Sequence, residues 1–287
     1  MILFASSLKR AFSATTIGSI GLVLGLMSFP KVAQAQFTIS PQVVELNAKR
    51  GQAQGSILMI NGASTPLPTK SYITPFTYDR ESGFQELKES PQDLTPYVQL
   101  YPANVTLAGT EQRRIRFVAR LAPNLPDGEY RAMIFTELNS IEVPKEQVLE
   151  AGNTIVMTTS VQPRFGVAVY VRKGNISSKL NVEKTSWDNN THQVKVLVKN
   201  SGKATAIVQG EWTLKQGDKT ITKGRVQDTT VIAEGDRMVN ISMLSSNEVT
   251  PEKLAPGRYQ LEGNILWGFN YSQKIPYQVS FEIPTKK

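Results

Sequence analysis

The residues that carry most enzyme chemistry are nearly absent from this chain. His192 is the only histidine among 287 residues, and there is no cysteine. A triad of serine, histidine and carboxylate would have to use His192, which lies in the polar turn 188–192, so we interpret it as a solvated turn residue. Zinc sites built from cysteine and histidine are excluded by the same count. We therefore predict no catalytic residue and no metal site.

The sequence also shows no motif for hydrolysis by paired carboxylates or for phosphate binding by a glycine-rich loop. Carboxylate pairs such as those of glycoside hydrolases need acidic residues from distant strands, and no spacing in the sequence singles out a pair. A phosphate-binding glycine-rich loop opens a helix, and residues 36–287 show no useful stretch of helical periodicity. A hydrolase with paired carboxylates stays as a minor alternative. The residue inventory favours a binding protein without a cofactor or a small-molecule substrate.

The clearest cluster of charge is a stripe of arginines in a single predicted strand. Arg114, Arg116 and Arg120 alternate with the apolar residues Ile115, Phe117, Ala119 and Leu121. This period of two predicts a half-buried strand. The stripe is compatible with a nucleic acid or an acidic partner, but no aromatic residues are interleaved with the arginines for base stacking. We therefore favour a solvated outer face and predict no nucleic-acid partner.

The N-terminal stretch has the features of a secretory signal peptide. Lys9 and Arg10 precede the uncharged segment 11–29, and small residues stand three and one positions before a cleavage site after Ala35. An uncleaved anchor helix is the alternative, but three glycines within the apolar segment favour cleavage. The prediction makes this an exported protein. Loss of residues 1–35 lowers the net charge from +8 to about +5.

The remaining chain consists of strand signals separated by Pro and Gly turns. The predicted strands cover residues 37–40, 43–46, 57–60, 72–78, 97–101, 104–107, 114–121, 132–138, 154–171, 180–183, 193–198, 207–214, 239–243, 263–269 and 275–283. Without helical periodicity, this pattern predicts an all-β protein. Because there is no cysteine, its domains must be stabilised by their cores rather than by disulfides.

Two pairs of landmarks occur in the same order in the two halves of the chain. A Gly-containing turn leads into Tyr130, and a similar turn leads into Tyr259. In a β-sandwich, a tyrosine after such a turn forms a tyrosine corner, with its hydroxyl bonded to upstream backbone. Asn61 and Asn200 each end an apolar strand well upstream of their tyrosine. A chance pair of turns is the alternative, but the double repeat favours two similar domains.

We therefore predict two tandem immunoglobulin-like β-sandwich domains, residues 36–174 and 175–287, with residues 172–175 as the linker. The apolar stretch 154–171 is too long for one ordinary strand, because 18 residues would extend about 60 Å. Pro163 and Gly166 are expected to mark a kink or a change of pairing partner in this stretch.

Residues 37–175 resemble the N-terminal domain of the periplasmic pilus-assembly chaperones. The resemblance rests on an ordered series of segments, 39–46, 57–61, 102–107, 115–117, 125–126 and the apolar strand to Leu138. In that family two immunoglobulin-like domains meet at an angle, and the last strand of the first domain completes a pilin subunit by strand addition. The matching strand would present Ile155, Met157, Thr159 and Val161 to a subunit of a pilus or another surface fibre.

The resemblance also implies an anchor for the C-terminal carboxylate of the subunit. The family uses an arginine and a lysine at positions that correspond here to Val43 and Gly166, neither of which has a cationic side chain. Arg164 is the substitute candidate. The resemblance thus implies a chaperone for fibre subunits, with an outer-membrane assembly protein as a further partner. A structural or adhesive envelope protein on the same scaffold is the alternative, since fold does not fix function.

Overall fold

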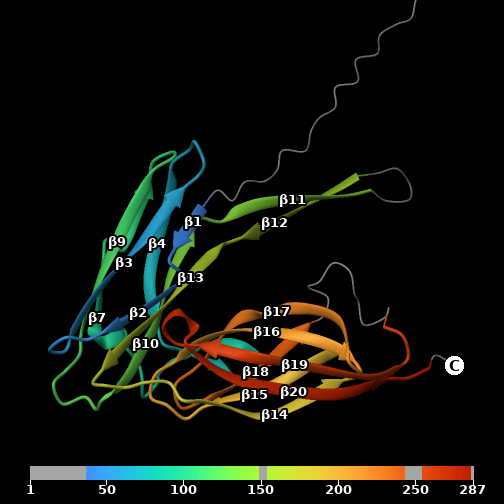
Figure 1. Ribbon diagram of the computed structural model, residues 1–287. Coiled ribbons are helices and arrows are strands. Elements are labelled where there is room, and N and C mark those ends of the chain that lie inside the picture. Colours follow the sequence, from blue (N-terminus) through green and yellow to red (C-terminus); the bar gives the residue numbers. More distant parts are fainter. Residues whose placement is uncertain (1–36, 149–153, 243–253, 286–287) are drawn as a thin grey trace, which may run out of the picture. The chain divides into compact units, whose positions relative to one another are not determined.

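The computed structural model describes residues 37–148, 154–242 and 254–285, and the side chains of residues 141–159 are not described. The predicted signal peptide, residues 1–35, lies outside this part. The regular elements of the described part are β-strands and short 3₁₀ turns (Figure 1), which confirms the all-β prediction. Within the same residues, no helix has the length and apolar character needed to cross a membrane.

The first sandwich consists of a four-stranded and a five-stranded sheet. The four-stranded sheet has the order β1 (Phe37–Ser40), β3 (Gln52–Asn61), β9 (Gln112–Arg120), β7 (Val98–Tyr101). The five-stranded sheet has the order β2 (Val43–Asn47), β13 (Arg164–Lys173), β10 (Gly128–Leu138), β4 (Leu67–Thr74), β8 (Asn104–Leu107). All neighbours are antiparallel except β2 and β13, which are parallel. The chain therefore changes sheets at Pro41, between β1 and β2.

The second sandwich repeats this plan with a three-stranded and a four-stranded sheet. Their orders are β14 (Leu180–Asp188), β15 (Gln193–Asn200), β18 (Asp236–Ser242), and β17 (Lys219–Val231), β16 (Ala206–Gln216), β19 (Gly257–Trp267), β20 (Gln273–Ile283). In the first sandwich β3 pairs with β9 in one sheet and β4 with β10 in the other. In the second sandwich β15 pairs with β18 and β16 with β19 in the same way, as in immunoglobulin-like domains. The predicted fold class is confirmed.

Each sandwich has its own hydrophobic core. The first includes Ile57, Ile115, Phe117, Ile134 and Val167, and the second is built around Trp212. The predicted alternation of β9 is confirmed, because its apolar residues are buried and Arg114, Arg116 and Arg120 are exposed. Residues Ala35–Lys287 form one compact unit. The predicted domain boundary after residue 174 falls between β13 and β14 and remains a prediction.

The landmark residues of the two halves make equivalent hydrogen bonds. Tyr130 Oη donates to the carbonyl of Pro126 at 2.9 Å, and Tyr259 Oη donates to that of Ala255 at 2.8 Å. Each tyrosine thus makes the bond of a tyrosine corner, Tyr130 at the start of β10 and Tyr259 at the start of β19. Asn61 and Asn200 are both buried, and each donates its side-chain amide to backbone carbonyls across its turn. The sequence repeat therefore reflects equivalent structural positions.

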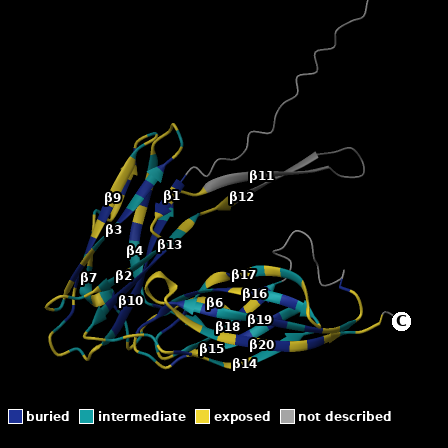
Figure 2. Cartoon of the chain, in the orientation of Figure 1, coloured by how far each residue is buried: buried dark blue, intermediate teal, exposed yellow. Residues whose placement is uncertain are grey.

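Strand β10 is buried on both of its faces, which explains the apolar run from Ala132 to Phe135 (Figure 2). One face packs into the sandwich core. The other is covered by the hairpin of β5 (Phe76–Asp79) and β6 (Gly83–Glu86), which adds aromatic rings above the sheet. We call this group the aromatic cluster. It consists of Tyr72, Phe76, Tyr78, Phe84, Phe135 and Tyr170, with ring centroids 5.6 to 6.3 Å apart between neighbours.

Candidate partner-binding strand

The predicted long strand is divided into two strands with different partners. β12 (Thr154–Val161) pairs with β11 (Ile141–Val148) in a separate two-stranded sheet, whereas β13 pairs with β10 and β2. The break falls at Gln162 and Pro163, so the predicted change of partner at Pro163 is confirmed. In Figure 1 the hairpin β11–β12 continues from β10 and β13 and extends beyond the first sandwich.

The hairpin joins the sheet through a one-residue irregularity. The last pair of the sheet is Glu137 with Arg164, and the first pair of the hairpin is Ile141 with Val161. Three residues on one arm therefore face two on the other, as in a β-bulge. The N–H of Leu138 still donates to the carbonyl of Pro163 at 3.0 Å, which links the two ladders. The bulge lets the hairpin leave the sheet without a break in the antiparallel pair.

Gly166 does not mark a break, and that part of the prediction is wrong. It lies within β13, opposite Phe135. A Cβ at this position would lie 2.9 Å from Sδ of Met133 and 3.1 Å from the ring of Phe135. The glycine therefore allows the sheet to pack closely against the aromatic cluster, rather than ending a strand.

Within the described part of the chain, β12 has an unpaired edge. Only β11 pairs with it. Its sequence contains no charged residue and no proline, whereas β11 contains Pro144, which cannot donate a backbone hydrogen bond. Exposed edges in natural proteins are usually protected by charges, prolines or bulges. Strand β12 has none of these between its ends, so its edge can accept another extended segment.

The structure places the predicted contact residues on this strand but describes only one of their side chains. The side chain of Val161 is 45% exposed, so it is accessible to a partner. The side chains of Ile155, Met157 and Thr159 lie outside the described residues. Their backbones pair in register with Gln147, Lys145 and Val143 of β11.

Arg164 lies at the end of β13, beside the bulge, and is already paired within the chain. Its guanidinium carbon lies 4.0 Å from the ring centre of Phe135, and Nη1 is 2.9 Å from Oε2 of Glu86. A second bond, at 3.3 Å, reaches the hydroxyl of Tyr72. The hydrogen bonds to Tyr72 and Glu86 raise the pKa of Arg164. The side chain is 40% exposed, so the guanidinium is accessible to solvent as well.

The two positions that correspond to the family's anchor are close together in space. Val43 pairs with Ala168 of β13, two residues beyond Gly166, and packs against the aromatic cluster. Gly166 borders the same cluster. Val43 and Gly166 therefore lie on one face of the sheet. Here that face holds aromatic and aliphatic groups, and the nearest cation we identify on it along β13 is Arg164.

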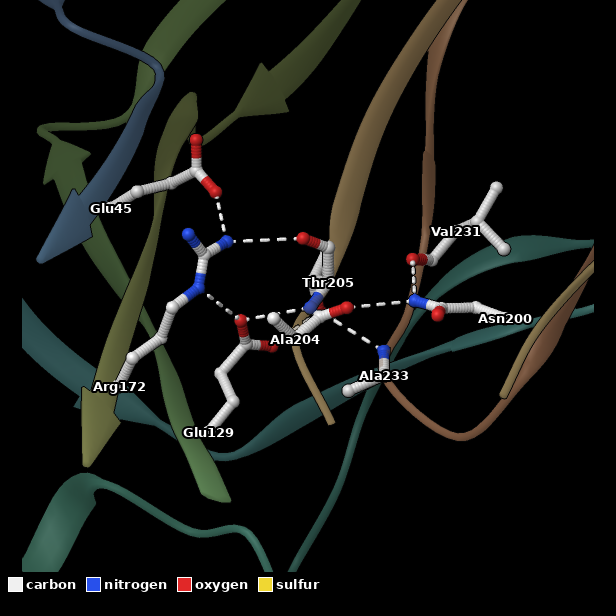
Figure 3. A network of polar contacts seen from close by, with 8 residues as sticks. All are labelled: Glu45, Glu129, Arg172, Asn200, Ala204, Thr205, Val231 and Ala233. Carbon is white, nitrogen blue, oxygen red and sulfur yellow. Dashed lines mark hydrogen bonds and ion pairs between the residues drawn. The ribbon is translucent and has the colours of Figure 1, made fainter. Parts of the chain in front are cut away.

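A polar site connects the two sandwiches, and no motif in the sequence predicts it (Figure 3). The carboxylate of Glu129 on β10 accepts the N–H of Thr205 at 2.9 Å and also bonds its hydroxyl. Arg172 on β13 donates to the same carboxylate at 3.2 Å and to the carbonyl of Thr205 at 3.0 Å, and it also pairs with Glu45. Both backbone groups of Thr205 are thus satisfied by the first sandwich.

The repeat landmark Asn200 places Thr205 at this site. Its side chain bonds the carbonyls of Ala204 and Val231 and so fixes the turn that carries Thr205, whose hydroxyl accepts the N–H of Ala233 at 3.1 Å. Glu129 is only 3% exposed. Burial raises the pKa of its carboxyl, and the hydrogen bonds from Thr205 and the charge of Arg172 oppose that rise.

The turn of the β5–β6 hairpin makes a further contact between the sandwiches. Arg80 forms an ion pair with Asp236, with Nε at 2.8 Å from Oδ1, and its carbonyl accepts the N–H of Met238 at 2.9 Å. Arg237 donates to the carbonyl of Asp79 at 2.6 Å. The same hairpin therefore covers the aromatic cluster and contacts the second sandwich.

These contacts correct one prediction from the sequence. Arg172 and Lys173 belong to β13, not to a linker. A basic pair followed by Gly-Asn is typical of a connecting segment, which is why the sequence favoured a linker here. In the structure Arg172 pairs with Glu45 and Glu129, which lie far away in the sequence. Residues 174 and 175 do lie between the sandwiches, and Gly174 has a φ of 80° that a glycine adopts readily.

The single histidine is exposed in the turn before β15, as predicted. Its ring lies 6.1 Å from that of Trp187, and it has a φ of 51°. In the described part of the chain, no group of three or more His, Asp or Glu residues is arranged to hold a metal ion.

The described chain is thus an immunoglobulin-like two-sandwich protein with a projecting hairpin. Searches with protein-family models and among curated proteins find no match. Solved structures do align. A chain from a chaperone–tip adhesin complex of CFA/I fimbriae biogenesis is 14% identical, with 88% of this chain and 100% of that chain covered and a TM-score of 0.45.

Two further structures align to a similar extent. A chain of the CsuC–CsuE chaperone–tip adhesion subunit complex of Acinetobacter baumannii is 13% identical, covers 85% of this chain and 98% of its own, and has a TM-score of 0.44. A chain of the SafA pilin and SafB chaperone complex of Salmonella enterica is also 13% identical, with coverage of 85% and 96% and a TM-score of 0.44.

Proposed function

We propose that this protein is an exported, periplasmic chaperone that binds subunits of pili or other surface fibres by β-strand addition to β12. The observation that carries the proposal is the free edge of β12, an uncharged strand of eight residues without a proline. Residues 1–35 support export. The proposal involves no catalytic step, in keeping with the residue inventory.

Strand addition explains why this edge is unprotected. A partner segment aligned along β12 would exchange backbone hydrogen bonds with it, and alternate side chains of β12 would enter a groove of the partner. Residues 155, 157, 159 and 161 form the alternating set. Thr159 is the polar member, so the partner groove would need to accommodate a hydroxyl at that point. An isolated edge of this kind also attracts its own copies, and a bound partner removes that risk.

Arg164 is the proposed anchor for a carboxylate of the partner. It lies three residues beyond Val161, at the root of the hairpin, so a partner segment that runs along β12 would end close to it. Its guanidinium presents several donors and is 40% exposed. Binding would require Arg164 to exchange or share its present carboxylate, Glu86.

Co-purification from the periplasm tests the proposal. The native protein is expected to retain a partner, and the variant with Met157→Asp and Val161→Asp is expected to lose it, because two charges would enter an apolar groove of the partner. The matched control carries Gln278→Asp and Ser280→Asp, two exposed positions on β20, the edge strand of the second sandwich. This control is expected to keep the partner.

Retention of the partner by the β12 variant, at the level of the β20 control, would remove β12 from the binding mechanism. Loss in both variants would show that added charge, and not the strand, decides the result. Arg164→Ala tests the anchor separately, since undiminished binding by that variant would exclude a role for Arg164 while leaving strand addition intact.

A further inference from the structure

The outer face of the sheet β1-β3-β9-β7 is a basic surface without acidic residues. The four strands contain four arginines, all on β9, and not a single Asp or Glu. Arg113 pairs with Glu111 just before the strand. Arg114, Arg116 and Arg120 are exposed, and within the described part of the chain no ion pair to them is found. Arg120 donates from Nη1 to Oε1 of Gln99 on β7 at 3.0 Å. The three guanidinium groups therefore lie on the same side of the sheet without a carboxylate partner in the described residues.

An aromatic residue lies among these arginines after all. Tyr101 of β7 pairs directly with Arg116 and is 81% exposed. No aromatic residue is interleaved with the arginines within β9 itself. The aromatic residue comes from the neighbouring strand β7, whose register places Tyr101 opposite Arg116. Tyr101 thus places an amphipathic ring, with an apolar body and a polar hydroxyl, on the same face as the guanidinium groups.

The surface between the charged groups is partly apolar and shallow. On β3, Leu58 pairs with Arg114 and is half-buried, and Val118 of β9 lies between Arg116 and Arg120. Two adjoining hollows of about 400 and 380 Å³ share Gln54 and Val118. One of them reaches Lys49, which adds a further cation at the rim. Neither is lined by the convergent polar groups that a specific small ligand would need.

The position of β9 limits how a partner can bind. Both of its edges are paired, with β3 and with β7, so a partner cannot add to it as a strand. Recognition must use the guanidinium groups, which bind phosphate oxygens with two parallel hydrogen bonds. The arginines are spread along one flat strand instead of converging. Such a surface fits many anionic groups arranged in a plane, and an exposed tyrosine beside it fits the boundary between headgroups and acyl chains.

We propose that this face binds a membrane surface rich in anionic phospholipids through Arg114, Arg116 and Arg120, with Tyr101 at the lipid interface. The surface belongs to the sheet opposite the one that continues into β12. Lipid binding is therefore separate from the proposed function, and either can fail without the other.

Co-sedimentation with vesicles tests the proposal, using the compact unit Ala35–Lys287. Vesicles of phosphatidylglycerol and phosphatidylcholine are compared with vesicles of phosphatidylcholine alone, at low and physiological salt. Binding is expected only to the anionic vesicles and is expected to weaken with salt. The variant with Arg114→Thr, Arg116→Thr and Arg120→Thr is expected to partition about 100-fold more weakly, because each basic residue near an anionic surface contributes about fivefold.

The control variant has the same change in charge on the second sandwich. It carries Lys219→Thr, Lys223→Thr and Arg225→Thr, three exposed residues of the edge strand β17, and is expected to bind nearly as the native protein does. Circular dichroism confirms that both variants are folded. Equal losses in the two variants, or equal binding of the native protein to neutral vesicles, would overturn the proposal. Tighter binding to polyglutamate than to anionic vesicles would assign the face to an acidic protein instead.

Discussion

Glu129 of the first sandwich accepts the backbone N–H of Thr205 in the second sandwich at 2.9 Å, and this carboxylate is almost completely buried. A buried carboxylate that binds a backbone donor of another domain couples the two domains, in addition to the contacts of the β5–β6 hairpin with the second sandwich. Arg172 completes the site, because it neutralises the charge and holds the carbonyl of the same residue. The two sandwiches are thus joined through Thr205.

The first prediction concerns the coupling that follows from this contact. Glu129→Ala is expected to lower the free energy of unfolding by about 3 kcal/mol, because it leaves a buried N–H without an acceptor and removes one of the two carboxylates that pair with Arg172. All three tryptophans, Trp187, Trp212 and Trp267, belong to the second sandwich. Their fluorescence during urea unfolding therefore reports on the domain that was not mutated, and its midpoint is expected to fall.

Glu111→Ala provides the control for that experiment. It removes the same charge from the first sandwich, but Glu111 pairs with Arg113 at the surface, so a cost below about 1 kcal/mol is expected. If Glu129→Ala shifts the far-ultraviolet circular dichroism transition and leaves the tryptophan transition at its native midpoint, the contact does not couple the two domains.

The second prediction concerns the tyrosine corners. Tyr130→Phe and Tyr259→Phe each remove one hydroxyl bond to a backbone carbonyl while keeping the buried ring, so each is expected to cost about 1 kcal/mol. Tyr259→Phe is expected to shift the tryptophan-detected transition directly. Tyr130→Phe is expected to act mainly on the first sandwich, and a larger tryptophan shift for Tyr130→Phe than for Tyr259→Phe would contradict this assignment.

The repeated landmarks could be predicted because their signals are local. A glycine turn before Tyr130 and Tyr259, and an asparagine at the end of an earlier strand, are visible in short stretches of sequence. Periodicity also predicted the alternation of β9. The break at Pro163 followed from the length of the apolar stretch and from the missing N–H of proline.

The contacts between the sandwiches could not be predicted, for a physical reason. Glu129 and Thr205 are 76 residues apart, and neither stands out by type or spacing. The aromatic cluster joins rings from β4, β5, β6, β10 and β13, so it exists only once the sheet has formed. Gly166 was misinterpreted because a glycine in a strand can signal either a kink or close packing, and only the position of Met133 decides between them.

The third prediction concerns acid. The hydrogen bond from Arg80 lowers the pKa of Asp236 below its ordinary value of 3.8. A lowered pKa means that the folded state favours the ionised form, so this contribution to stability is present above pH 3.8 and is lost as the pH falls through the lowered value. Asp236→Asn is expected to cost up to about 1 kcal/mol at neutral pH and nearly nothing near pH 2.

The difference in unfolding free energy between native protein and variant, measured at both pH values, checks this. The difference between the two proteins is used because Asp79, next to Arg80 in the β5–β6 hairpin, titrates in the same acidic range. Hydrogen bonds from the backbone and the hydroxyl of Ser82 lower the pKa of Asp79 to about 2. A difference that stays constant from neutral pH to pH 2 would show that the ion pair with Arg80 contributes no stability.

The fourth prediction concerns competition at Arg164. If Arg164 binds a carboxylate of the partner, Glu86 competes for the same guanidinium, from which it lies 2.9 Å away. Glu86→Gln is therefore expected to tighten partner binding by about twofold to fivefold, the equivalent of one exposed ion pair. Titration calorimetry with the partner recovered by co-purification measures this change, and Arg164→Ala is expected to weaken binding.

The double variant shows whether the two residues act on the same group. In the Arg164→Ala background, Glu86→Gln is expected to have no further effect on partner binding, because there is then no guanidinium for which Glu86 and the partner could compete. Arg164→Ala also removes the stacking on Phe135, so its fold must be checked by circular dichroism. Tighter binding on Glu86→Gln that persists without Arg164 would mean that Glu86 repels the partner directly, and Arg164 would then have no role as an anchor.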